Sequence, residues 1–116
     1  MSQNRRSRKR VNLSFYLIAK DATTAESLGN IVDITPAGFL LLSTKERMPQ
    51  ANISVNIDLP EPVDDCRLIN CICEIKRCRK SANPDFYEVG FDITYASSQT
   101  KLIIEHIQQK WELRLA

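Results

Sequence analysis

Residues 12 to 20 alternate between apolar and polar positions. The apolar positions are every second residue: Leu13, Phe15, Leu17 and Ala19. A period of two residues is typical of a β-strand that buries one of its faces. The pattern therefore predicts a strand over residues 12 to 20 whose opposite face, with Ser14 and Lys20, meets solvent.

Five further stretches have the same short apolar or alternating character, and segments rich in Pro, Asp, Asn, Ser and Thr separate them. They are residues 29 to 34, 38 to 43, 53 to 59, 67 to 77 and 85 to 95. Short strands at this spacing are typical of a small antiparallel barrel or sandwich. From Ser97 onward the period changes to four, at Ile103, Ile107 and Trp111, with Ile104 alongside. A serine-rich cap opens this segment, which predicts an amphipathic helix. The predicted fold class is mainly β: a six-stranded antiparallel β-barrel with a C-terminal α-helix.

The charge of the chain is unevenly distributed. The 116 residues carry a formal net charge of +2, and removing the five basic residues between positions 5 and 10 leaves 11 minus 14, or −3. The length is that of one domain. We therefore predict a flexible basic arm over residues 1 to 11 and a barrel with its helix over residues 12 to 116. Such an arm attracts phosphates, acidic lipids or acidic protein surfaces.

The N-terminal residues lack the apolar core of a signal peptide, and no apolar stretch approaches the roughly 20 residues that cross a bilayer. We therefore expect a cytoplasmic protein without membrane insertion.

The cysteines lie close together in the chain, at Cys66, Cys71, Cys73 and Cys78. Their Cys-x4-Cys-x-Cys-x4-Cys spacing differs from the Cys-x2-Cys pairs of structural zinc sites, and the single histidine, His106, lies in the predicted helix. We predict no metal site. Cys71 and Cys73 share an apolar strand face with Ile69 and Ile75, which predicts two small core residues.

The sequence offers little support for an enzyme. His106 has no plausible nucleophile near it in the sequence, and the three glycines form no phosphate-binding loop. The carboxylates Glu61, Asp64 and Asp65 fall in a proline-containing segment that we interpret as a solvated loop. We predict a binding protein with no catalytic residues.

Two short motifs carry the candidate chemistry. Arg6 and Arg10 form an Arg-x3-Arg pair, and residues 33 to 38 form an Asp-x-Thr-x-x-Gly turn between two apolar runs. An arginine can pair with a phosphate or with the O6 and N7 atoms of guanine, and it can stack on a base. Asp33 can accept hydrogen bonds from the guanine N1 and N2 edge, and Gly38 permits a positive φ or a close approach by a ligand. Taken separately, a basic tail and an ordinary hairpin turn with an Asx cap explain the two motifs.

In this order and separation the two motifs resemble those of the PilZ domain, a bacterial family of receptors for the second messenger cyclic di-GMP. The resemblance extends to the segment 87 to 93, which is similar to the closing strand of the family, and to the helix that follows it. It implies that Arg6, Arg10, Asp33, Thr35 and Gly38 bind the ligand. Thr35 stands where the family most often has serine, and it keeps the hydroxyl but adds a methyl group.

Two more arginines enter the candidate site through this resemblance. Arg5 is similar to a residue of members that bind two stacked cyclic di-GMP molecules. Arg77 is a candidate stacking residue, although its place near a strand end also suits an ordinary exposed arginine. The resemblance implies an adaptor that changes conformation on binding cyclic di-GMP, needs no other cofactor and signals to an unidentified protein effector, for example in motility or biofilm formation.

Two alternatives stay open. The first is a PilZ-like interaction adaptor that no longer binds the ligand, to which Thr35 in place of serine gives some support. The second is a nucleic-acid-binding β-barrel whose basic arm tracks a phosphate backbone. The acidic body and the small number of aromatic residues make nucleic acid the weaker partner.

Overall fold

The computed structural model describes residues 17 to 115, with side chains described to residue 110. It contains six strands and one helix: β1 (Leu17–Asp21), β2 (Ser27–Thr35), β3 (Gly38–Ser43), β4 (Gln50–Val63), β5 (Cys66–Lys80), β6 (Tyr87–Tyr95) and α2 (Ser98–Leu115). The predicted fold class is confirmed. The predicted arm, its boundary at residue 11, and the first five residues of the strand expected over 12 to 20 lie outside the described residues.

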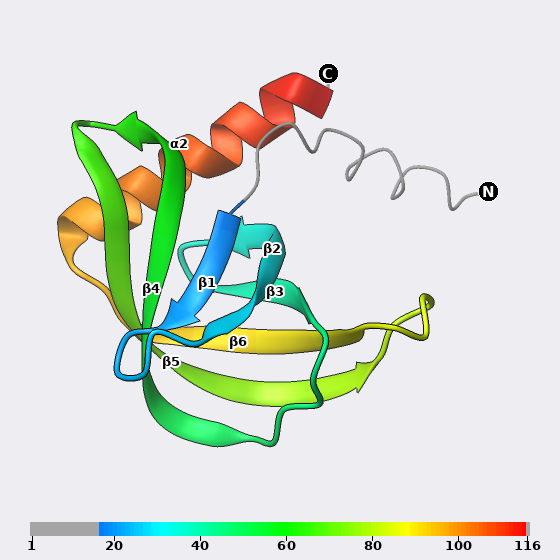
Figure 1. The fold of residues 1–116 in the computed structure, drawn as a ribbon. Coiled ribbons are helices and arrows are strands. Elements are labelled where there is room, and N and C mark those ends of the chain that lie inside the picture. The colour runs from blue at the N-terminus through cyan, green and yellow to red at the C-terminus, as the bar shows by residue number, and fades with distance from the viewer. Residues whose placement is uncertain (1–16, 116) are drawn as a thin grey trace.

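The strands form a closed antiparallel barrel in the order β1-β2-β3-β6-β5-β4 (Figure 1). Aliphatic side chains from every strand fill its interior, among them the fully buried Leu17, Leu41, Val55, Ile57 and Val89. Burial of Leu17 and Ala19 confirms the face that the alternation predicted for β1. A single core therefore unites strands that are distant in the sequence.

Helix α2 lies across one end of this barrel and contacts β2 and β5 (Figure 1). Its predicted apolar stripe is confirmed for Ile103, Ile104 and Ile107, which are all buried in the barrel core. The side chain of Trp111, the fourth predicted member, lies outside the described part. The backbone N–H of Thr100 donates to Oγ of Ser97 at 3.1 Å, so the predicted serine cap also forms.

The loop that we expected around Glu61 is instead the end of β4. Glu61 lies within that strand, and the turn consists of Asp64 and Asp65, whose φ angles are +51° and +64°. Proline cannot donate to a ladder, but pairing between β4 and β5 is interrupted from Asp58 to Val63, where Pro60 and Pro62 lie. The strand therefore tolerates both prolines.

This end of the hairpin is tied to the helix. Lys110 lies 3.6 Å from the Glu61 carboxylate, and Nδ1 of His106 lies 3.5 Å from that of Asp64. His106 lies in the helix, as predicted, and is exposed there. The two contacts link α2 to the far end of β4 and to the turn that follows it.

Cys71 and Cys73 are core residues, as their positions in the strand predicted, with 1% and 0% of their surfaces exposed. Their sulfur atoms are 3.6 Å apart. This contact and burial raise the pKa of the Cys73 thiol, which therefore stays protonated. Cys66 and Cys78 are half-buried.

Candidate functional site

Strand β2 departs from regular pairing at Val32. Ile31 pairs with Leu41 and Asp33 pairs with Leu40, which leaves Val32 as an extra residue on β2. Regular alternation would turn Asp33 inward after the buried Ile31, since successive side chains point to opposite faces. Asp33 is exposed instead. The bulge at Val32 therefore turns this carboxylate to the outer surface of the barrel.

Strand β5 has a similar bulge at Lys76. Ile75 pairs with Phe91 and Arg77 pairs with Gly90, so Lys76 has no partner on β6. Alternation after the buried Ile75 would send Arg77 into the core, but Arg77 is exposed and Cys78 packs against the core instead. The bulge thus exchanges the two faces of the strand and turns Arg77 outward.

Both bulges border one open groove of about 540 Å³ that crosses β2, β3, β6 and β5. Four of the predicted ligand-binding residues line it: Asp33, Thr35, Gly38 and Arg77. Lys76 and Asp92, which the sequence analysis did not select, also line it. The other predicted residues, Arg5, Arg6 and Arg10, lie outside the described part of the chain.

Gly38 and Gly90 line the groove on β3 and β6, and the side chains of Phe39 and Phe91 on the same two strands are buried in the barrel core. The cross-strand neighbours Phe39 and Phe91 stack with their centroids 4.7 Å apart and their planes at 15°. A Cβ at Gly90 would lie 3.6 Å from Cγ and 3.7 Å from Nε of Arg77, so the arginine side chain lies over this glycine. These are ordinary contact distances, so Arg77 packs against β6 at Gly90 and a methyl group there would not displace it.

We expected Gly38 to allow a positive φ or the close approach of a ligand, but the structure gives a different reason for a glycine at this position. Its φ is not among the positive values, and a Cβ there would clash with the carbonyl oxygen of Phe91. The close approach at Gly38 is therefore made by the backbone of β6.

Thr35 closes the hairpin between β2 and β3. It pairs with Gly38 across the two-residue loop Pro36–Ala37. Its Oγ1 accepts a hydrogen bond from the backbone N–H of Ala37 at 3.1 Å, and the Ala37 carbonyl accepts one from Ile93 at 2.8 Å. The Asx cap considered for Asp33 is absent, because no hydrogen bond within residues 17 to 110 uses that carboxylate. Asp33 is therefore available to a ligand, whereas the Thr35 hydroxyl also has a local role.

The groove balances two carboxylates, Asp33 and Asp92, with two cations, Lys76 and Arg77. Nζ of Lys76 lies 3.9 Å from the carboxylates of both Glu74 and Asp92. Among the residues whose side chains are described, Arg77 forms no ion pair. The surface can accept hydrogen bonds from base N–H groups and can donate to phosphate or to carbonyl oxygens.

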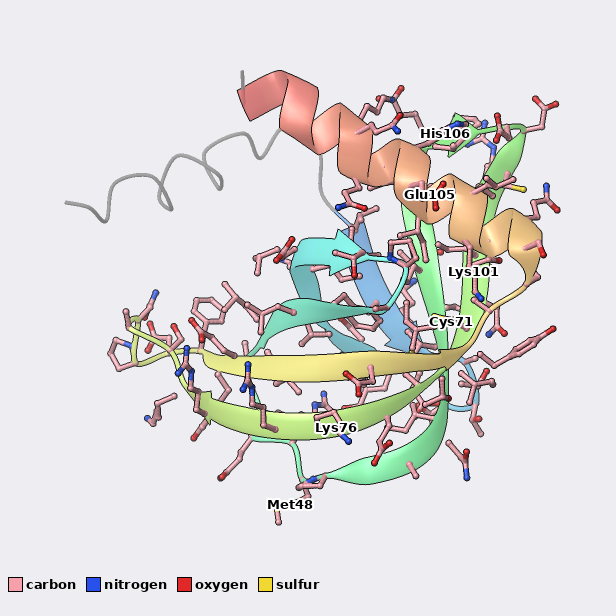
Figure 2. The ribbon with its side chains drawn as sticks, turned by 180° about the vertical axis from the view of Figure 1, so that it is seen from behind. Met48, Cys71, Lys76, Lys101, Glu105 and His106 are labelled. Atoms are coloured by element: carbon pink, nitrogen blue, oxygen red, sulfur yellow. The ribbon has the colours of Figure 1, made fainter. Side chains whose placement is uncertain are left out.

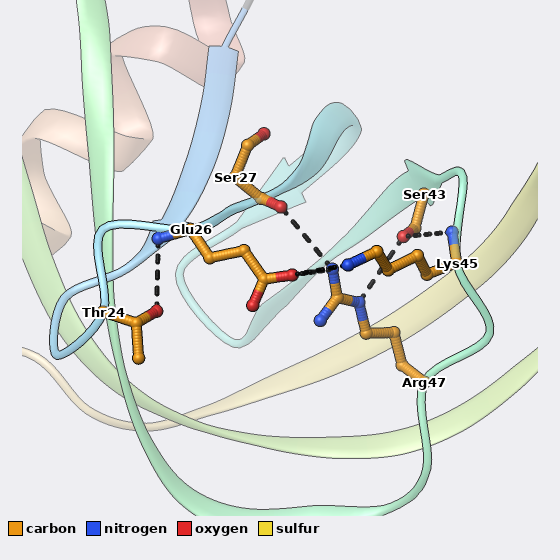
Figure 3. Close-up of polar contacts among 6 residues, drawn as sticks. All are labelled: Thr24, Glu26, Ser27, Ser43, Lys45 and Arg47. Atoms are coloured by element: carbon orange, nitrogen blue, oxygen red, sulfur yellow. Dashed lines mark hydrogen bonds and ion pairs between the residues drawn. The ribbon is translucent and has the colours of Figure 1, made fainter.

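A second polar cluster lies away from the groove and joins two loops (Figure 3). The Glu26 carboxylate contacts Lys45 at 3.2 Å and Arg47 at 3.4 Å, while Nε of Arg47 lies 3.5 Å from Oγ of the buried Ser43. The hydrogen bond from Lys45, followed by the charge of Arg47, holds the pKa of Glu26 below its ordinary value of 4.5. This cluster attaches the segment after β3 to the start of β2.

Residues 17 to 115 contain no cluster of three or more His, Cys, Asp or Glu side chains arranged to hold a metal ion. None of their helices has the length and apolar character needed to span a membrane.

No model of a known protein family matches the chain, and no curated protein matches it. Among solved structures, the chain is similar to the Bacillus subtilis inhibitor of motility (MotI/DgrA), with a TM-score of 0.58 and 10% sequence identity. The match covers 86% of this chain and 47% of the other, so this chain spans about half the length of that protein. At this identity, the likeness shows a shared fold.

Proposed function

We propose that the protein is a cytoplasmic cyclic di-GMP receptor of the PilZ type that acts as an adaptor. The observation that carries the proposal is the groove in which Asp33, Thr35, Gly38 and Arg77 meet. The motif and the family resemblance selected these residues from the sequence, and they come from three different strands. Their presence around one open surface is what a shared ligand would require.

The chemistry of the groove suits a guanine base. The carboxylate of Asp33, which has no partner among the described residues, can accept hydrogen bonds from guanine N1 and N2. An arginine can bind O6 and N7 or stack on the ring. Arg77 lies over Gly90 without an ion-pair partner among the described residues, so its guanidinium is open to either role. In the proposal, Arg6 and Arg10 bind the phosphates and the exposed base faces from the arm, and Arg5 serves a second ligand molecule.

The proposed output is through another protein. The likeness to the inhibitor of motility supports an adaptor that acts on a motility system after the ligand orders the basic arm. The proposal needs no catalytic residue and no cofactor besides the ligand.

The groove offers less support for a nucleic-acid module. A surface that tracks a phosphate backbone usually carries an excess of positive charge, since phosphate contacts dominate that affinity. Here Asp33 and Asp92 offset Lys76 and Arg77.

Calorimetric titration with cyclic di-GMP at near-physiological salt tests the proposal. The wild type should bind saturably, and Arg6→Ala and Arg10→Ala should each abolish detectable binding. Asp33→Asn should weaken binding by about tenfold or more, because an amide cannot accept from both guanine donors at once. Cyclic di-AMP, which lacks the guanine edge, serves as the ligand control.

Arg79→Ala is the matched protein control. Arg79 is an exposed arginine of the same strand as Arg77, but it pairs with Glu88 at 3.0 Å and does not line the groove. Its removal should leave affinity unchanged. If the wild type gives no heat with the dinucleotide, the receptor proposal fails. A parallel titration with a short DNA oligomer then separates a nucleic-acid role from the adaptor that binds no ligand.

A further inference from the structure

Lys76 is the extra residue of the β5 bulge, and this gives it an unusual position. Consecutive residues of a regular strand point to opposite faces, yet Lys76 and Arg77 both line the groove. Figure 2 shows Lys76 on β5, well away from helix α2. The bulge therefore delivers two adjacent cations to one surface.

The ammonium group of Lys76 has electrostatic contacts with two carboxylates but no hydrogen bond to either of them. Its distance of 3.9 Å from Glu74 and from Asp92 is too long for a hydrogen bond, whereas Lys20 reaches Asp58 at 3.0 Å on the same barrel. Among the described residues Lys76 donates no side-chain hydrogen bond, and its side chain is 52% exposed. Its three N–H donors therefore have no hydrogen-bond acceptor within the described part of the chain and can donate to a ligand with strong acceptors.

We propose that Lys76 forms a phosphate subsite of the groove, an inference that rests on the proposed function. A lysine acts toward phosphate as a compact point charge, whereas the planar fork of the neighbouring Arg77 suits a base edge or a ring face. The two residues bind different parts of the ligand: Arg77 binds the guanine and Lys76 binds a phosphate oxygen. Glu74 and Asp92 hold the ammonium group over the groove until the phosphate replaces them.

The two carboxylates also compete with the ligand for Lys76. Loss of the Asp92 charge should raise affinity in two ways, by freeing Lys76 and by removing direct repulsion of the phosphate. Only the release of Lys76 requires a lysine at position 76, since the direct repulsion between Asp92 and the phosphate does not involve that residue. A double-mutant cycle with Lys76→Gln and Asp92→Asn therefore separates them.

Titration of these variants with cyclic di-GMP tests the subsite. Lys76→Gln should weaken binding by about three- to tenfold, the range for one partly exposed charge-assisted contact, and its affinity should depend less on salt. Lys76→Arg should stay within about twofold of the wild type, because it keeps the charge. Lys101→Gln removes the same charge from an exposed position on α2 (Figure 2) and should leave affinity unchanged. Equal unfolding temperatures confirm that the variants are folded.

The outcomes distinguish the two proposals. If the wild type does not bind, the proposed function fails and the subsite fails with it. If the wild type binds and Lys76→Gln binds equally well, the subsite alone is overturned. The subsite is also overturned if Asp92→Asn raises affinity by the same factor in the wild type and in the Lys76→Gln variant. The Asp92 carboxylate would then act on the ligand without Lys76.

Discussion

Individual glycines show how a motif residue can serve the fold and the site together. Gly38 was selected as part of a ligand-binding turn, but in the structure it allows β3 to approach the Phe91 carbonyl of β6. Gly90 has space above it, and among the described residues only the Arg77 side chain occupies that space. The two glycines of the groove therefore differ: Gly38 is required by the close contact with β6, whereas Gly90 is covered by Arg77 at a distance that a methyl group would tolerate.

This difference predicts opposite results for the same substitution. Gly38→Ala should destabilise the protein by about 1–3 kcal/mol, because the new methyl group clashes with a backbone atom that cannot move freely. Gly90→Ala should change stability by less than about 1 kcal/mol, since its methyl would meet Arg77 at ordinary contact distances. Urea unfolding measures both. Equal losses for the two variants would contradict the strand-contact role of Gly38.

At the scale of elements, the two bulges explain why the sequence predicted the strands better than the site. The alternation of Ile69, Cys71, Cys73 and Ile75 correctly gave the buried face of β5. Nothing in the residues from Lys76 to Lys80 signals that the alternation shifts, because a bulge is defined by pairing with another strand. Lys76 was missed for this reason, and Asp92, a regularly paired residue of β6, was missed because no motif marks it. Asp33 and Gly38 were found through a motif.

Strand boundaries were predicted least well where proline is involved. The Pro60 and Pro62 pair indicated a loop, and only the interrupted register from Asp58 to Val63 shows how β4 includes them. Such a register is a property of two strands together, and the sequence of one segment does not contain it.

The cluster of Glu26, Lys45 and Arg47 predicts a local dependence on pH. Because the folded-state pKa of Glu26 is lowered, the cluster contributes fully above the ordinary value of 4.5 and loses its contribution as pH falls through the folded-state pKa. As pH falls from about 6 to below 4.5, the protection factors of the amides of residues 44 to 49, taken relative to the intrinsic exchange rate at each pH, should therefore fall in an acid step in the wild type.

Two variants check this assignment. In Glu26→Gln the exchange of residues 44 to 49 should already be fast at the higher pH and should lack the acid step. Glu46→Gln removes an exposed carboxylate from the same segment that forms no ion pair with a described residue. It should behave like the wild type. An acid step that survives in Glu26→Gln would assign the pH dependence to another group.

For the molecule as a whole, the architecture could be predicted from the sequence because the spacing of apolar residues indicates which face of a strand or helix is buried. Alternation or short apolar runs predicted the six strands, and a period of four predicted the closing helix and its isoleucine stripe. The groove did not follow, since it requires β2 and β5 to flank the β3–β6 pair, and that order depends on closure of the barrel.

The shared core predicts that barrel and helix unfold together. Ile104 is fully buried among barrel residues, so Ile104→Ala should cost about 2–5 kcal/mol and lower the unfolding midpoint of helix and strands alike. Leu102→Ala alters a helix residue that is 55% exposed and should be close to neutral. Circular dichroism and amide exchange during urea unfolding compare the two signals. Loss of the helix signal before the strand signal would contradict a single core.

The groove also has a mechanical consequence. Its two bulged strands, β2 and β5, lie on either side of the β3–β6 pair and belong to opposite halves of the chain. A ligand that binds both Asp33 and Arg77 would connect β2 with β5 and would oppose the sliding of one strand past another. Binding at the groove would then restrain the movement of strands beyond the residues that contact the ligand.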